Sequence, residues 1–134
     1  MKPLAQHAAT TFLKLVAGLG PGEGKRIDNA PGIYMAVSVD CLDRGAAGTV
    51  YAVAHRFELN GDLCPDPDVE FLVVGDGAGP RLVFPTAIDQ TLGYRRYVEF
   101  GRDGRPQQYS KAGQAGLALF CDDWMRNIRA QQGL

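Results

Sequence analysis

Side chains that could carry chemistry are concentrated in one stretch of this sequence, which begins at His55. The residues that follow Arg56 supply five carboxylates and one amide, with no lysine or arginine among them: Glu58, Asn60, Asp62, Asp66, Asp68 and Glu70. A histidine beside a carboxylate can act as an acid–base pair. Several carboxylates can coordinate a hard cation such as Ca²⁺, and a fixed acidic surface can select a basic partner. The acidic segment 58–70 therefore allows three kinds of chemistry, besides a structural role in a turn.

Residue spacing separates these alternatives. Period-two alternation over 49–59 places His55 and Glu58 on opposite faces of a strand, which argues against a catalytic pair. The acidic segment lacks the ligand spacing of an EF-hand loop and its glutamate at the twelfth position. The sequence contains no G-x-S-x-G or H-E-x-x-H motif. We therefore predict no catalytic residues, metal ligands or cofactor, and we assign the six residues of the acidic segment to binding of a protein with a basic surface.

A second group of residues favours a different interpretation. Tyr94, Arg95 and Arg96 combine aromatic rings with guanidinium groups, which can stack on and neutralise a nucleic-acid strand. Arg126 and Arg129 in the C-terminal segment could extend such a surface. The net charge of -1 provides no global attraction to nucleic acid. Nucleic-acid binding through these five residues is the alternative function, and a metal-dependent enzyme is the third.

Two helices and a sheet must position these residues. Apolar residues recur at three- and four-residue spacing over 4–19 and again over 110–131, which predicts a helix in each range. The second stripe contains Trp124, which we expect in the core, and Ser110 is a suitable N-cap for this helix. Glycines in 18–32 resemble a phosphate-binding loop but lack its spacing, so we predict a flexible connector there.

Strands are predicted between the two helices. Alternating or short apolar runs lie at 33–40, 49–59, 68–74, 81–84 and 94–100, and turn residues separate them. Short connections make such strands antiparallel. The predicted fold is therefore α+β, with a four- to five-stranded antiparallel sheet within 33–100 and both helices packed on one of its faces. All of this forms a single domain over 1–134.

Composition limits the class of protein. The chain has 134 residues, of which 46% are hydrophobic and 22% charged, as in ordinary globular domains. It contains no apolar run of the ~20 residues that a membrane helix needs, and its first residues do not resemble a signal peptide. Three widely spaced cysteines do not form a disulfide framework. We therefore expect a cytoplasmic protein that does not enter a membrane.

The chain resembles a family of small uncharacterised bacterial proteins found on mobile genetic elements. The resemblance is carried by the pattern H-x-x-E-x-N-G-D-x-x-x-D-P-x-x-E-F, which starts at His55 and ends at Phe71, and by W-x-x-N-I-R from Trp124 to Arg129. It covers about three-fifths of the chain, from Tyr51 onward, and departs from the family pattern at Arg56 and Phe57, where the family has an aromatic pair. The resemblance implies no established activity and no catalytic residues.

These observations combine into one hypothesis about function. The sequence favours a non-enzymatic protein-binding module of a mobile element, which engages its partner through an acidic hairpin. The mobile-element setting suggests an inhibitor of a bacterial defence complex, of the anti-CRISPR kind, whose target is a nucleic-acid-binding effector with a basic surface.

Overall fold

The computed structural model describes residues 1–75 and 79–134, and its fold is α+β. Strands β1 to β6 form one antiparallel sheet in which each strand pairs with its neighbours in sequence. The fold class is confirmed, but the sheet has six strands and not four or five. The elements are α1 (Gln6–Val16), β1 (Gly24–Ile27), β2 (Val37–Gly45), β3 (Gly48–Leu59), β4 (Asp62–Val74), β5 (Leu82–Gln90), β6 (Gly93–Arg96), β7 (Val98–Phe100), β8 (Pro106–Tyr109) and α2 (Lys111–Gln132).

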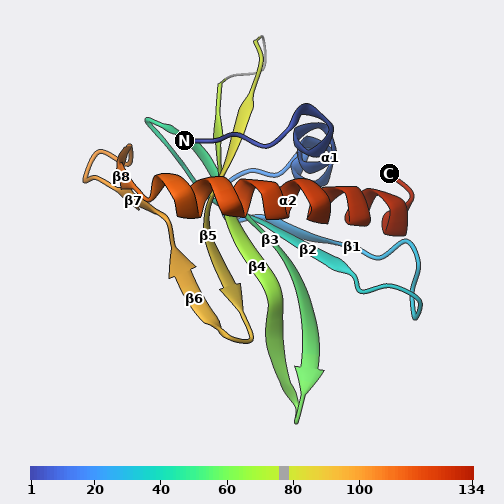
Figure 1. Ribbon diagram of the computed structural model, residues 1–134. Coiled ribbons are helices and arrows are strands. Elements are labelled where there is room, and N and C mark those ends of the chain that lie inside the picture. The colour runs from blue at the N-terminus through green and yellow to red at the C-terminus, as the bar shows by residue number, and fades with distance from the viewer. Residues whose placement is uncertain (76–78) are drawn as a thin grey trace.

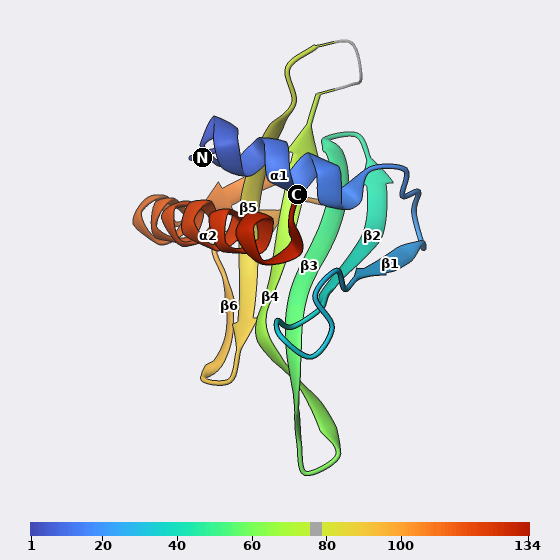
Figure 2. The same cartoon turned by 90° about the vertical axis from the view of Figure 1, so that its right-hand side faces the viewer.

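Both helices lie on the same face of the sheet, which we call the helix face (Figures 1 and 2). The apolar stripe of α1 buries Phe12, whose ring centroid lies 4.6 Å from that of Phe71 on β4. Alternate residues of the central strands complete this core, because side chains of a strand point to its two faces in turn. No helix covers the other face within the described residues, and we call it the open face.

Helix α2 matches its sequence signals closely. The Ser110 hydroxyl accepts a hydrogen bond from the Gly113 amide, and Gly133 ends the helix with a left-handed φ of 66°. Five residues of the predicted apolar stripe are buried, namely Leu117, Cys121, Trp124, Met125 and Ile128, whereas the sixth, Phe120, is exposed. Helix α1 is shorter than the predicted 4–19. It begins at Gln6 and ends at Val16, because the flanking residues Ala5 and Ala17 have non-helical backbone angles. Within the described residues, neither helix combines the length and the apolar character that crossing a bilayer requires.

The predicted connector at 18–32 contains a strand that the sequence pattern does not reveal. Strand β1 pairs with β2 at the edge of the sheet, with Lys25 opposite Val39. It is four residues long and largely exposed, so it has no apolar alternation. The next predicted strand starts later than expected, because Ile33 lies in an exposed turn and β2 begins only at Val37. In both places the partner strand determines the structure more than the local pattern does.

Two further boundaries differ from the predicted ones. Strand β5 continues through Pro85 to Gln90, because the register with β4 shifts next to this proline and accommodates it. The predicted strand 94–100 is divided at Tyr97 into β6 and β7, and β7 pairs with β8 in a separate hairpin. The predicted turn at 75–80 lies partly outside the described residues, and Asp76 is one of the residues outside them.

Candidate protein-binding site

The first part of the acidic segment forms the end of a two-stranded arm, and the rest of the segment lies within the sheet. Strand β3 pairs with β2 only as far as Ala54, and β4 pairs with β5 only as far as Asp68. Residues 56–59 and 62–65 therefore pair only with each other, and this hairpin extends well beyond the rest of the sheet (Figures 1 and 2). We call residues 56–66 the arm.

The turn at the tip of the arm explains why both strands continue so far. Asn60 and Gly61 occupy the two central positions with φ of 52° and 85°. Positive φ at both positions is the signature of a type I′ turn, whose twist matches that of the flanking strands. The Asn-Gly pair thus closes a tight hairpin. Strand β4 begins at Asp62 and not at the predicted 68, so residues expected between the strands, such as Leu63, become cross-strand neighbours of β3.

The structure divides the six predicted binding residues into two groups. Four of them are exposed and lie on the arm or at its base, and their side chains make no hydrogen bond or ion pair in the described part of the chain: Glu58, Asn60, Asp62 and Asp66. Asp68 and Glu70 lie further along β4, within the sheet and on its open face. The six residues therefore do not project together from one tip, because the chain passes from the arm into the sheet between Asp66 and Asp68.

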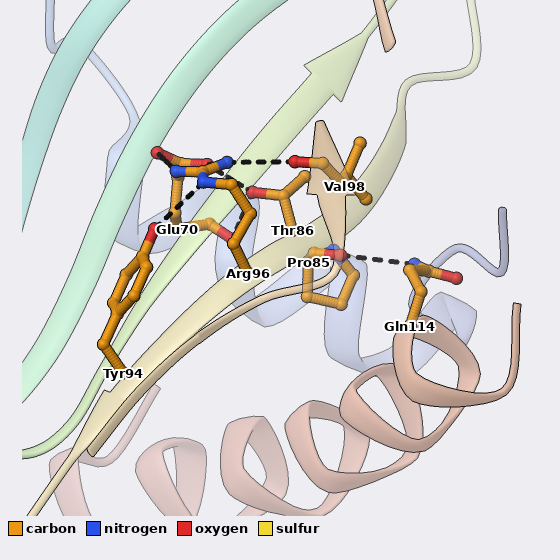
Figure 3. Close-up of polar contacts among 7 residues, drawn as sticks. All are labelled: Glu70, Pro85, Thr86, Tyr94, Arg96, Val98 and Gln114. Carbon is orange, nitrogen blue, oxygen red and sulfur yellow. Dashed lines mark hydrogen bonds and ion pairs between the residues drawn. The ribbon is translucent and has the colours of Figure 1, made fainter. Parts of the chain in front are cut away.

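Each of the two carboxylates in the sheet is bound by an arginine of the same chain. Arg56 lies 3.2 Å from Asp68. Arg96 donates to both carboxylate oxygens of Glu70, at 2.9 and 3.0 Å, and Thr86 donates its hydroxyl proton to Glu70 at 2.6 Å. Figure 3 shows the Arg96 guanidinium held between Glu70, the Tyr94 hydroxyl and the Val98 carbonyl. These bonds raise the pKa of Arg96, with the hydrogen bonds to Glu70 as the main cause.

The residues of the nucleic-acid alternative do not form one surface. Tyr94 and Arg96 lie on the open face, and Arg96 is occupied by Glu70. Arg126 and Arg129 are exposed on α2, which covers the opposite face; Arg126 pairs with Asp123, and Arg129 donates to the Leu134 carbonyl. Arg95 lies opposite Ile88, so it belongs to the other face of the sheet from Tyr94 and Arg96. Only separate guanidinium groups therefore remain for a nucleic acid.

His55 is a buried residue of the helix face. The indole Nε1 of Trp124 donates to His55 Nδ1 at 3.3 Å, and the two rings meet edge to face with centroids 5.5 Å apart. Because Nδ1 accepts this bond, the neutral ring carries its proton on Nε2, which has no partner among the described residues. Burial lowers the pKa of His55, and the nearby Asp66 carboxylate opposes this effect. The ring contacts neither Glu58 nor Glu70, as strand alternation predicted.

The buried His55 ring should make stability depend on pH. Its folded-state pKa is lowered, so the unfolded chain binds the proton first as pH falls. We expect the free energy of unfolding to be constant above about pH 7 and to decrease as pH falls below about 6.5, by at most ~1.4 kcal/mol per pH unit. Urea unfolding of wild type and His55→Gln between pH 7.5 and about 5 measures this slope.

The second histidine supplies the control for this measurement. His7 is exposed on α1, so His7→Gln should keep the slope that His55→Gln removes. An equal slope in wild type and His55→Gln would show that other groups cause the pH dependence.

Metal binding at the acidic segment finds no support in the geometry. Among the described residues, no three histidine, cysteine, aspartate or glutamate side chains converge on a point where a metal ion could sit.

The Arg96–Glu70–Thr86 network and the Arg56–Asp68 pair were not foreseen from the sequence. One signal could have suggested them, since alternation over 68–74 places Asp68 and Glu70 on the face opposite the apolar residues.

The fold and the arm define a small α+β domain with one helix-covered sheet face and a projecting acidic hairpin. The chain belongs to the family described as domain of unknown function DUF6908, which matches residues 7–134. The match agrees with the expected resemblance to an uncharacterised domain family. No curated protein and no solved structure matches the chain.

Proposed function

We propose that this protein is a non-enzymatic binding module whose arm inserts into a basic groove of a protein partner. The observation that carries the proposal is the extension of the arm beyond the sheet, with the side chains of Glu58, Asn60, Asp62 and Asp66 unengaged in the described part of the chain. A carboxylate that is already bound to an internal arginine gains little from a partner, whereas those of Glu58, Asp62 and Asp66 have no such arginine among the described residues.

The arm offers more than charge. Leu59 and Leu63 are exposed near its tip, where they offer apolar contact area beside the carboxylates. The outer edges of 56–59 and 62–65 also present unpaired backbone groups, because each strand has only one neighbour there. A groove that is basic, partly apolar and able to add a strand would complement all three features.

Nucleic-acid-binding effectors have basic grooves of this kind. The proposed partner is therefore such an effector, and inhibition of a bacterial defence complex on behalf of a mobile element is the specific form of the proposal. An acidic arm in the groove would exclude the nucleic acid by occupying its site. Binding of this kind should weaken with added salt, because the charges involved are exposed.

The proposal is tested by placing a photo-crosslinking amino acid at position 63 of the full chain and exposing it to lysate of the native host. The matched control carries the same amino acid at position 119, since Leu119 is also an exposed leucine but lies on α2. We expect a crosslinked partner from position 63 and none from position 119. Equal crosslinking from both positions, or none from either, would contradict the proposal.

Removal of the arm charges should weaken partner binding. We expect the triple variant Glu58→Gln, Asp62→Asn, Asp66→Asn to bind the crosslinked partner at least about tenfold more weakly, mainly through slower association. The control variant Glu99→Gln, Asp103→Asn, Asp123→Asn removes as much charge from other exposed sites and should bind as wild type does. Binding that is unchanged by the arm substitutions would exclude the arm, and a shift of labelled DNA or RNA at low salt would instead favour the nucleic-acid alternative.

A further inference from the structure

The open face of the sheet carries a charged hollow at the base of the arm. Two rows of cross-strand neighbours cross it: Ala54, Asp68, Asp89 and Tyr94 form one row, and Asp40, Ala52, Glu70, Ala87 and Arg96 form the other. Cross-strand neighbours share a face. The small side chains of Ala52 and Ala87 in the second row leave a hollow of about 290 Å³, which is lined mainly by charged side chains.

The charges around the hollow do not balance. Four carboxylates, those of Asp40, Asp68, Glu70 and Asp89, line the hollow, and the guanidinium groups beside them are those of Arg56 and Arg96. Arg26 on β1 belongs to the same face but does not line the hollow, and it pairs with Asp28. Arg96 directs four of its five N–H donors to Glu70, Tyr94 and Val98, so its charge is held at Glu70. Arg56 then remains for three carboxylates, and the side chains of Asp40 and Asp89 have no ion-pair partner in the part of the chain that the structure describes.

The raised pKa of Asp68 is consistent with the same deficit of positive charge. Burial raises its pKa, and the carboxylates of Asp89 and Asp40 raise it further, while Arg56 opposes both effects without cancelling them. A second cation in the hollow would relieve the repulsion among the three carboxylates. The exposed ring of Tyr94 stands at the edge of the hollow, and a planar guanidinium can stack on such a ring whereas an ammonium cannot.

We infer that the open face is a second contact surface for the protein partner, and that the hollow between Asp40, Asp68 and Asp89 receives an arginine side chain from it. Charge complementarity identifies the occupant, because the carboxylates that line the hollow outnumber the guanidinium groups beside them, and the side chains of Asp40 and Asp89 have no ion-pair partner among the described residues. The hollow adjoins Arg56, where the arm begins, so a partner that holds the arm can reach it. The inference rests on the proposed function in one respect: the arginine belongs to the proposed protein partner.

The test uses the full chain and the peptide acetyl-Gly-Arg-Gly-amide, with acetyl-Gly-citrulline-Gly-amide as its uncharged counterpart. Backbone amide NMR shifts locate each peptide and give its dissociation constant. We expect saturable shifts at residues 40, 68, 87 and 89 with the arginine peptide, and affinity at least about tenfold lower with the citrulline peptide. Equal affinities, shifts that do not saturate, or shifts confined to 56–66 would overturn the inference.

Three variants separate this inference from the function of the arm. Asp40→Asn with Asp89→Asn should weaken the arginine peptide at least about tenfold, and the single variant Asp89→Asn should weaken it less, in case the double variant does not fold. Glu58→Gln with Asp62→Asn should leave peptide affinity unchanged. Failure of the hollow inference therefore does not affect the arm proposal, and failure of the arm proposal does not affect the hollow inference. Unchanged affinity in both hollow variants would exclude the hollow, and tighter binding of agmatine than of the peptide would identify a small-molecule site instead.

Discussion

Trp124→Ala should lower the free energy of unfolding by about 3–5 kcal/mol. The indole is 6% exposed and lies between α2 and the sheet, edge to face with the His55 ring. Its removal leaves a large cavity and also deprives the buried His55 Nδ1 of its hydrogen-bond donor. Urea unfolding at pH 7.5, where His55 stays neutral, measures the loss without interference from protonation.

Two further variants divide this effect into its parts. Trp124→Phe keeps an aromatic ring but removes the donor, so it should cost less than Trp124→Ala. Phe120→Ala is the surface control on the same helix, because Phe120 is 41% exposed, and it should cost less than about 1 kcal/mol. If Trp124→Ala cost as little as Phe120→Ala, the ring would not be part of the core.

Periodicity predicted the parts of the fold in which one face of an element is buried. The last helix shows this clearly, since the stripe at Leu117, Cys121, Trp124 and Ile128 can be buried by only one orientation of α2. Strand alternation likewise placed His55 in the core and away from Glu58. These results depend on the direction of side chains within one element, which the local sequence determines.

Features that depend on pairing between elements were not predicted. Strand β1 forms because β2 offers a free edge, and β5 passes through Pro85 because the register shifts there. The candidate site shows the same limit: composition identified the acidic segment, but only the register of β3 to β6 brings Arg96 to Glu70 and Arg56 to Asp68. Residues 26 apart in sequence, as Glu70 and Arg96 are, give no local signal of their contact.

The Glu70–Arg96 pair should be strongly coupled. The two side chains are 21% and 26% exposed, so most of each charge is shielded from water. Arg96→Met leaves the Glu70 carboxylate with only the Thr86 hydroxyl as a side-chain donor, and we expect a loss of about 2–3 kcal/mol, somewhat below the range for a fully buried pair. Glu70→Met should cost a similar amount, because the guanidinium of Arg96 then has no counter-charge beside it.

The double variant distinguishes a coupled pair from two independent residues. Replacement of both charges leaves no unpaired ion in the sheet, so Glu70→Met with Arg96→Met should cost about 1–3 kcal/mol less than the sum of the single substitutions. The matched control is the Arg126–Asp123 pair on α2, whose side chains are 65% and 77% exposed; its coupling should stay below about 0.5 kcal/mol and disappear in high salt. Equal coupling energies for the two pairs would mean that solvent reaches Glu70 freely, and that the open face does not hold its arginines in fixed positions. Strong coupling at Glu70 alone would instead confirm that Arg96 is occupied, which leaves the carboxylates of Asp40 and Asp89 as the groups available to a partner.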